Sequence, residues 1–137
     1  NDKLSVTITS FSYKREIPID LADNGGGFVF DCRGINNPGR HLDFKLLNGR
    51  SSEVIKFLEG NSEAEDFLSH IFPIVDLTIE TYLERGFKDL MINFGCTGGQ
   101  HRSVYCADKM FEHLKTKYDI NLFLSHIEQG IKEEVIK

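Results

Sequence analysis

The alternation of short apolar runs with longer helical patterns constrains the fold of this chain more than any other feature. Apolar runs that favour strands occupy residues 4–10, 28–32, 90–94 and 121–124. Apolar residues recur at helical spacing over 63–85, and again beyond residue 100 up to Leu114. Strands that alternate with helices favour a layered α/β domain with a mostly parallel central sheet flanked by helices. We predict this architecture for residues 1–137 as a single domain, which is the domain number that this length favours.

Local signals predict where some of these elements begin and end. Ser62–Glu65 has the Ser-x-x-Glu pattern of a capping box and predicts the start of the longest helix. Gly86 predicts its end. The polar tail at 125–137 has no sustained apolar pattern, and we expect it to fray.

Composition and charge exclude several classes of protein. Apolar residues make up 40% and charged residues 27%, which excludes a disordered or collagen-like chain. The apolar runs are too short to cross a membrane, and no targeting segment is recognised, so we expect a cytoplasmic protein with no membrane partner. The three cysteines form no Cys-x-x-Cys pair, and His70 and His113 have no histidine partner one turn away. We therefore predict no disulfide framework, no metal site and no cofactor.

The segment with the clearest chemistry is Gly95–Ser103, which joins the apolar run at 90–94 to a helix. In open α/β sheets, ligands bind beyond the carboxyl ends of strands. A helix that starts there leaves main-chain N–H groups unpaired and carries about half a positive charge. Gly98 and Gly99 allow the main chain to approach a ligand closely. Together these features predict an anion-binding loop.

Side chains of the same loop supply further donors. Arg102 offers a two-pronged guanidinium, and His101 offers a titratable donor. Because a free imidazole titrates near pH ~6.5, anion affinity should fall as the pH rises through that range. The predicted anion-binding residues of the loop are Cys96, Thr97, Gly98, Gly99, Gln100, His101, Arg102 and Ser103. The alternative is a structural turn in which the glycines serve packing and Ser103 caps the helix.

The spacing Cys-x5-Arg-Ser from Cys96 to Ser103 also matches the loop of cysteine-dependent phosphatases. A thiolate at the start of a helix, beside Arg102, would be stabilised and could attack phosphorus. However, Gly95 stands where those enzymes usually have histidine, and no aspartate has a supporting motif as general acid. We therefore predict binding rather than catalysis, with a phosphatase that uses Cys96 and Arg102 as an alternative.

A wider pattern gives a family resemblance. The chain contains Phe30-Asp31-Cys32-Arg33, Asn37-Pro38, Asn48-Gly49 and, at 95–104, Gly-Cys-Thr-Gly-Gly-Gln-His-Arg-Ser-Val. In order and spacing this resembles the C-terminal domain of the RNase adapter protein RapZ family, whose stretches read roughly F-D-[VC]-R-x-x-x-N-P, T-G and G-C-T-G-G-x-H-R-S-V. The resemblance runs from about Val6 to about Leu114, and the loop is its specific part.

The resemblance implies a regulatory domain of a bacterial-type protein. Full-length members carry an N-terminal P-loop nucleotide-binding domain, whereas this chain has no G-x-x-x-x-G-K-[ST], so we expect a partner domain in a longer parent chain. The family's C-terminal domain is associated with binding small regulatory RNA and with sensing glucosamine-6-phosphate, an amino-sugar phosphate. The family's ligand-contacting histidine and arginine correspond to His101 and Arg102.

Two further predictions concern the extent of the site and its partner. Asp31 and Arg33 share one face of a strand, where they either pair with each other or line the anion site. The segment 127–134 is not basic and the net charge is −5, which weakens non-specific attraction to polyanions. We therefore predict a domain that binds phosphate or a phosphorylated small molecule, with an RNA-binding adapter as the other alternative.

Overall fold

Five strands form one sheet in the order β2-β3-β1-β4-β5. The computed structural model describes residues 3–61 and 63–137. The first four strands run parallel to one another, and β5 runs antiparallel to β4. The strands are β1 (Ser5–Ser12), β2 (Phe28–Asp31), β3 (Asp89–Cys96), β4 (Asn121–His126) and β5 (Ile131–Val135). The predicted α/β domain with a mostly parallel sheet is confirmed.

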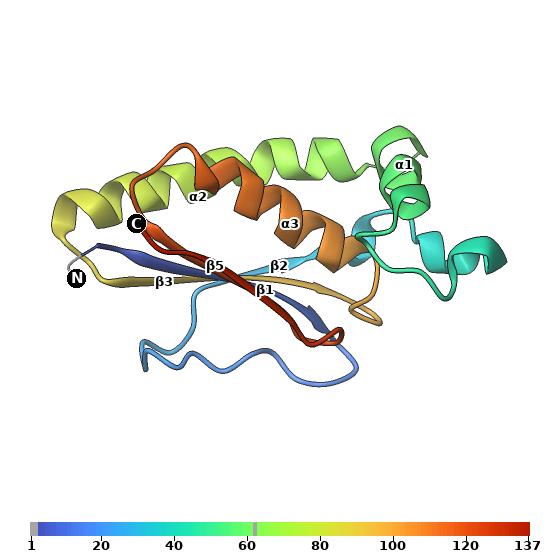
Figure 1. The fold of residues 1–137 in the computed structure, drawn as a ribbon, viewed down its shortest axis with the longest axis horizontal. Coiled ribbons are helices and arrows are strands. Elements are labelled where there is room, and N and C mark those ends of the chain that lie inside the picture. Colours follow the sequence, from blue (N-terminus) through green and yellow to red (C-terminus); the bar gives the residue numbers. More distant parts are fainter. Residues whose placement is uncertain (1–2, 62) are drawn as a thin grey trace.

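The helices are α1 (Ser52–Asn61), α2 (Ala64–Arg85) and α3 (Arg102–Lys115). α2 and α3 cover one face of the sheet, α1 lies beyond the end of the strands beside the start of α2, and residues 13–27 cross the opposite face (Figure 1). Ser62 of the expected capping box lies outside the described residues. α2 ends as predicted at Gly86, which has a φ of 71° and donates to the Leu83 carbonyl. Within the described residues, no helix is both long and apolar enough to cross a membrane.

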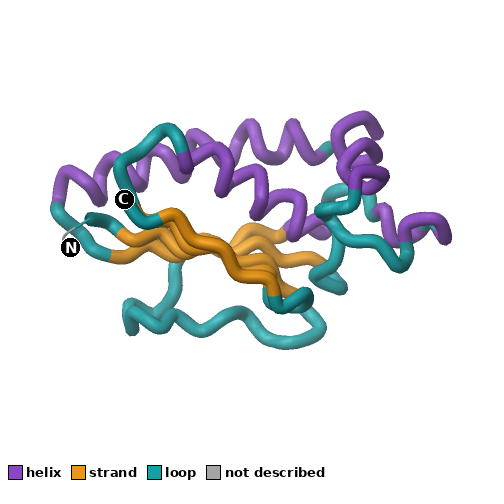
Figure 2. Tube along the Cα trace, viewed as in Figure 1, coloured by secondary structure: helices purple, strands orange, loops and turns teal. Residues whose placement is uncertain are grey.

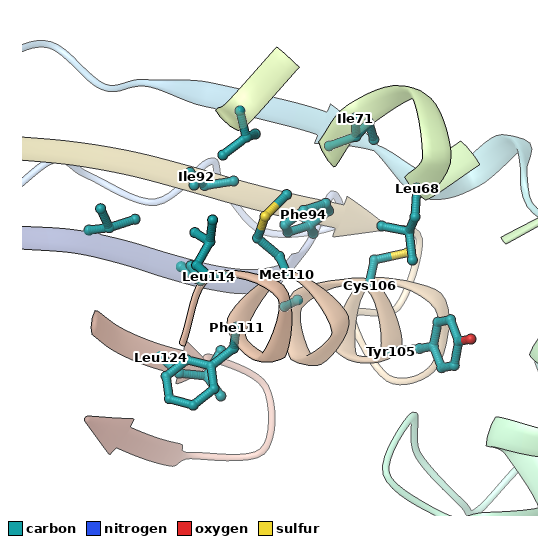
Figure 3. Close-up of a cluster of buried hydrophobic side chains, with 14 of the residues drawn as sticks. Leu68, Ile71, Ile92, Phe94, Tyr105, Cys106, Met110, Phe111, Leu114 and Leu124 are labelled. Carbon is teal, nitrogen blue, oxygen red and sulfur yellow. The ribbon is translucent and has the colours of Figure 1, made fainter. Parts of the chain in front are cut away.

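The core lies between the sheet and α2 and α3. Cys106, Met110 and Leu114 of α3 face the sheet close to Ile92 and Phe94 of β3 (Figure 3), and all five side chains are fully buried. Burial of a large apolar side chain contributes about 1.5–3 kcal/mol relative to exposure. This packing fixes the start of α3 near the carboxyl end of β3, where Figure 2 shows loops gathered around the beginning of the helix.

The tail differs from the prediction of fraying at 125–137. Residues 122–126 of β4 pair with 131–135 of β5, and a turn at Ile127–Gly130 connects the two strands. Gly130 permits this turn because its φ is 66°. The prediction was wrong because cross-strand pairing and contacts with distant residues stabilise β5, and neither is visible in the local pattern.

Candidate anion-binding site

The carboxyl ends of three neighbouring strands meet the start of α3. In the sheet register, Ser12 of β1 lies beside Cys96, and Asp31 of β2 lies beside Gly95. The chain leaves β3 at Cys96 and enters α3 at Arg102. The glycine-rich loop (residues 96–103) therefore lies at the edge where parallel α/β sheets place ligands.

The carbonyl groups of the glycine-rich loop are bound to other parts of the protein. Five of them, from Cys96 to His101 with the exception of Gly98, accept hydrogen bonds from other segments or from α3. These bonds are Tyr13 N to Cys96 (3.0 Å), Ser12 Oγ to Thr97 (2.6 Å), Gln129 Nε2 to Gly99 (3.0 Å), Gly49 N to Gln100 (2.7 Å) and Tyr105 N to His101 (3.0 Å). These contacts fix the orientation of the peptide groups in the loop.

The main-chain N–H groups of the same segment, unlike its carbonyls, have no hydrogen-bond partner among the described residues. From Thr97 to Val104, no main-chain N–H donates a hydrogen bond to any residue that the structure describes. The residues at 101–104 are buried. Since buried N–H groups in proteins almost always have a partner, this row of donors is suited to an acceptor from outside the chain.

The two central glycines have different roles. Gly99 has a φ of 68°, and a Cβ there would lie 3.0 Å from the main chain of Phe11 and Ser12 and 2.8 Å from Glu128. At Gly98, the nearest atom to a Cβ would be in the Gln100 side chain, 3.9 Å away. Gly99 is thus required by the loop conformation and its packing, whereas Gly98 leaves open space beside the main chain.

Arg102 is oriented differently from the open two-pronged donor that the sequence predicts. Its Nη1 donates to the carbonyls of Arg33 and Ile35, each at 2.9 Å, and the residue is 5% exposed. Its Nε is buried and has no partner within the described part of the chain. Arg102 therefore binds the turn that follows β2 to the start of α3, and its positive charge lies buried next to the loop.

His101 also contacts a neighbouring segment. Its Nε2 lies 2.9 Å from the Phe44 carbonyl, so Nε2 carries the hydrogen and donates it. Nδ1 gains a hydrogen only when the ring is protonated. The imidazole is 8% exposed, and its contact with Phe44 holds that segment against the start of α3.

The acid beside the loop does not suit the general acid that a phosphatase would need. Cys96 is 2% exposed, and its Sγ lies 3.1 Å from the fully buried Ser103 hydroxyl. Hydrogen bonds from Arg33, opposed by partial burial, hold the pKa of Asp31 below its usual range. An aspartate that stays ionised at neutral pH is a poor general acid. Asp31 therefore gives the phosphatase alternative no support, while the Ser103 hydroxyl beside Cys96 is compatible with either interpretation.

Asp31 and Arg33 pair with each other at the rim of the loop. Arg33 Nε and Nη2 donate to the two carboxylate oxygens of Asp31 at 2.9 and 2.8 Å. The Arg33 guanidinium also lies 3.9 Å from the centroid of the Tyr13 ring. Both members of the pair are about half exposed. Of the two interpretations left open by the sequence, the ion pair is present, and its position beside Gly95 keeps it at the edge of the site.

Several residues that shape the loop were missed by sequence reasoning. Gln129 Nε2 also donates to the Gln100 side chain at 2.7 Å, and Glu128 forms an ion pair with Arg15 at 2.8 Å. Ser12 could have been found, because it ends a strand parallel to β3. Gln129 belongs to the tail that was expected to fray, and no local signal marked it.

Comparison with known proteins identifies the family. The family model of the RapZ C-terminal domain matches residues 4–129. A nucleotide-binding protein of Dictyoglomus turgidum is 40% identical over 92% of this chain and 41% of its own length. Nucleotide-binding proteins of Acinetobacter baylyi and Staphylococcus aureus are 35% and 33% identical over 89% and 96% of this chain. The chain spans 41% to 43% of the length of these relatives. With this match, the chain belongs to the RapZ C-terminal domain family.

Proposed function

We propose that the glycine-rich loop binds the phosphate group of a small metabolite, and that the domain is a regulatory module of a longer protein. The proposal rests on a difference between the carbonyls and the N–H groups of the loop's main chain. Its carbonyls accept hydrogen bonds from the protein, while the N–H groups from Thr97 to Val104 have no acceptor among the described residues. A phosphate monoester carries a charge of about −1.5 to −2 at pH 7 and has three acceptor oxygens that suit such a row.

The electrostatics of the site support an anion. The start of α3 contributes about half a positive charge at the loop. Arg102 donates to two carbonyls and forms no ion pair with a described carboxylate, and the negative charge that interacts with it is that of Asp31. Asp31 is bound on both oxygens by Arg33, so two guanidinium groups share one carboxylate. A bound anion would add negative charge where burial has removed the hydration of the Arg102 guanidinium.

Among phosphorylated molecules we propose an amino-sugar phosphate, which is the ligand that the family resemblance implies. It would contact the loop residues Cys96–Ser103, with Asp31 and Arg33 at the rim. The relatives are named nucleotide-binding proteins, but they are more than twice as long as this chain. We assign their nucleotide site to the remainder of their length, since this chain has no P-loop pattern. We also propose a cytoplasmic location, which three cysteines without a disulfide support.

Isothermal titration calorimetry with three ligands tests this proposal. We expect glucosamine-6-phosphate to bind, inorganic phosphate to bind more weakly, and glucosamine not to bind. Equal binding of glucosamine and its phosphate, or no binding of either at millimolar concentration, would contradict it. A structured RNA hairpin forms a further arm: binding that weakens steeply with added salt would favour the RNA-binding alternative instead.

A further inference from the structure

A second polar cluster lies between the sheet and α3. Ser10 Oγ of β1 is 2.7 Å from His126 Nδ1 of β4, and His126 Nε2 is 2.8 Å from Asp108 Oδ1 of α3. The carboxylate can only accept, so Nε2 donates, and a neutral ring accepts the Ser10 hydroxyl hydrogen at Nδ1. Serine, histidine and aspartate form a hydrolytic triad in many enzymes. Here Ser10 and His126 are fully buried, so a substrate could not reach the hydroxyl.

Arg50 connects this cluster to the surface. Its Nε and Nη2 donate to the two carboxylate oxygens of Asp108 at 3.0 and 2.9 Å, and its Nη1 donates to Glu133 of β5 at 2.8 Å. Burial raises the pKa of Asp108, but hydrogen bonds from His126 and Arg50 outweigh that effect and lower it. The carboxylate is therefore ionised at neutral pH, and the paired hydrogen bonds from Arg50 hold the guanidinium in one orientation.

The residue before Arg50 contacts the glycine-rich loop directly. Gly49 N donates to the Gln100 carbonyl at 2.7 Å, which is a main-chain to main-chain hydrogen bond. A Cβ at Gly49 would lie 2.7 Å from Tyr105 N and 2.8 Å from Val104 Cβ, so its backbone packs against the first turn of α3. Arg50 N also donates to the Asn48 side chain at 2.8 Å, which fixes the turn that presents Gly49.

We infer that Arg50 is a positioning residue for the glycine-rich loop. Its contacts with Asp108 and Glu133 hold Gly49 against Gln100, and this hydrogen bond sets the direction of the N–H groups that follow. The inference rests on the proposed function in one respect: the oriented N–H groups are the ones proposed to bind phosphate. The hydrogen bond from Gly49 to Gln100, however, is present in the ligand-free protein and can be measured there.

The test compares Arg50→Gln with Arg50→Lys, Glu133→Gln and Lys109→Gln. Lys109, which lies on α3 as Asp108 does, forms a surface ion pair with Glu59 of α1, so Lys109→Gln controls for the loss of an ion pair from α3. Amide hydrogen exchange of Gly49 is measured without ligand. The dissociation constant for inorganic phosphate is measured by titration.

Arg50→Gln should speed exchange at Gly49 and weaken phosphate binding, each by about tenfold, the effect expected for loss of a charge-assisted hydrogen bond. Arg50→Lys and Glu133→Gln should show smaller changes, and Lys109→Gln none. Faster exchange with unchanged phosphate affinity would overturn the positioning role, as would weaker binding with unchanged exchange. If the unaltered protein binds neither inorganic phosphate nor glucosamine-6-phosphate, the proposed function fails, and with it the claim that Arg50 serves binding. Exchange at Gly49 then decides separately whether Arg50 holds the loop. If Arg50→Gln does not fold, the graded series from Arg50→Lys to Glu133→Gln gives the same test.

Discussion

Two glycine-containing loops of this domain differ in whether their main-chain N–H groups have a hydrogen-bond acceptor within the protein. At residues 20–26, the Asp20 carboxylate accepts from the N–H groups of Ala22 and Asn24 at 3.0 Å and of Gly26 at 3.2 Å. In the glycine-rich loop, the N–H groups from Thr97 to Val104 have no acceptor in the described part of the chain. Glycine content alone therefore does not define an anion site. What distinguishes the two loops is whether the chain supplies a carboxylate of its own.

The carboxylates near the two loops show the same difference. Main-chain hydrogen bonds, of which that from Ala22 has the largest effect, lower the pKa of Asp20. The charge of Asp20 therefore interacts with the N–H groups of its own loop. Asp31, which lies beside the glycine-rich loop, is bound on both oxygens by Arg33. An anion that reaches the glycine-rich loop thus does not displace a carboxylate already bound to its N–H groups.

The largest effect is expected from changing the glycine that shapes the loop. Gly99→Ala places a Cβ in a backbone conformation with positive φ and against the main chain of Phe11 and Ser12. We expect unfolding free energy to fall by about 1–3 kcal/mol and phosphate binding to be lost. Urea denaturation and a phosphate titration measure the two effects.

Gly98→Ala is the matched control, because a Cβ there would have open space. It should leave the urea midpoint nearly unchanged. If both variants are destabilised equally, the assigned difference between the two glycines is incorrect.

A second prediction gives the glycine-rich loop a carboxylate of its own, as Asp20 gives its loop. Thr97→Asp introduces a negative charge at an exposed position beside the free N–H groups. We expect phosphate affinity to fall by about 30-fold or more, since like charges in close contact cost several kcal/mol. Thr97→Asn has a similar size without the charge and should retain most of the affinity. Equal affinities in the two variants would show that the anion binds elsewhere.

A smaller effect is expected from the imidazole of the loop. Sulfate keeps its charge across neutral pH, so a change in its affinity reports on the protein. His101 Nε2 donates to the Phe44 carbonyl, so the ring holds the segment that ends at Phe44 beside the loop. His101→Ala removes this hydrogen bond, which contributes about 0.5–1.5 kcal/mol, and we expect sulfate affinity to fall by about three- to tenfold. His101→Gln can keep an N–H donor and should lose less, and unchanged affinity in His101→Ala would remove His101 from the site.

The smallest effect is expected from changing Asp20 in the loop at residues 20–26. The lowered pKa of Asp20 means that its contribution to stability is present above its ordinary value of 3.8 and is lost as the pH falls through the lower folded value. Asp20→Asn should therefore reduce the drop in urea midpoint between pH 7 and pH 3. Phosphate affinity at pH 7 should be unchanged, and any loss of affinity would mean that the two loops are not independent.

Most of the fold could be predicted from local sequence patterns. The apolar runs at 4–10 and 90–94 and the helical pattern at 63–85 correspond to β1, β3 and α2. The prediction failed for β5, where Ile131–Val135 has no clear alternating pattern. Its pairing with β4 and the ion pair from Glu133 to Arg50 depend on residues far away in the sequence.

The position of the candidate site could be predicted from the sequence, but the hydrogen-bond partners of its side chains could not. The glycines and the strand-to-helix position identified the loop at 96–103. The sequence could not show that Arg102 donates to carbonyls after β2, or that His101 Nε2 donates to Phe44. These contacts depend on how residues 33–44 fold back over α3, which local patterns do not specify. For the same reason, Gly49 and Gln129 were not recognised as partners of the loop.

The most direct test of the central claim is a titration of the ¹⁵N-labelled domain with inorganic phosphate, followed through its amide resonances. If the free N–H groups receive the anion, the largest saturable shifts will lie between Thr97 and Val104, while Ala22, Asn24 and Gly26 remain unchanged. Shifts that are absent from 97–104, or that are as large at the Asp20 loop, would contradict the account.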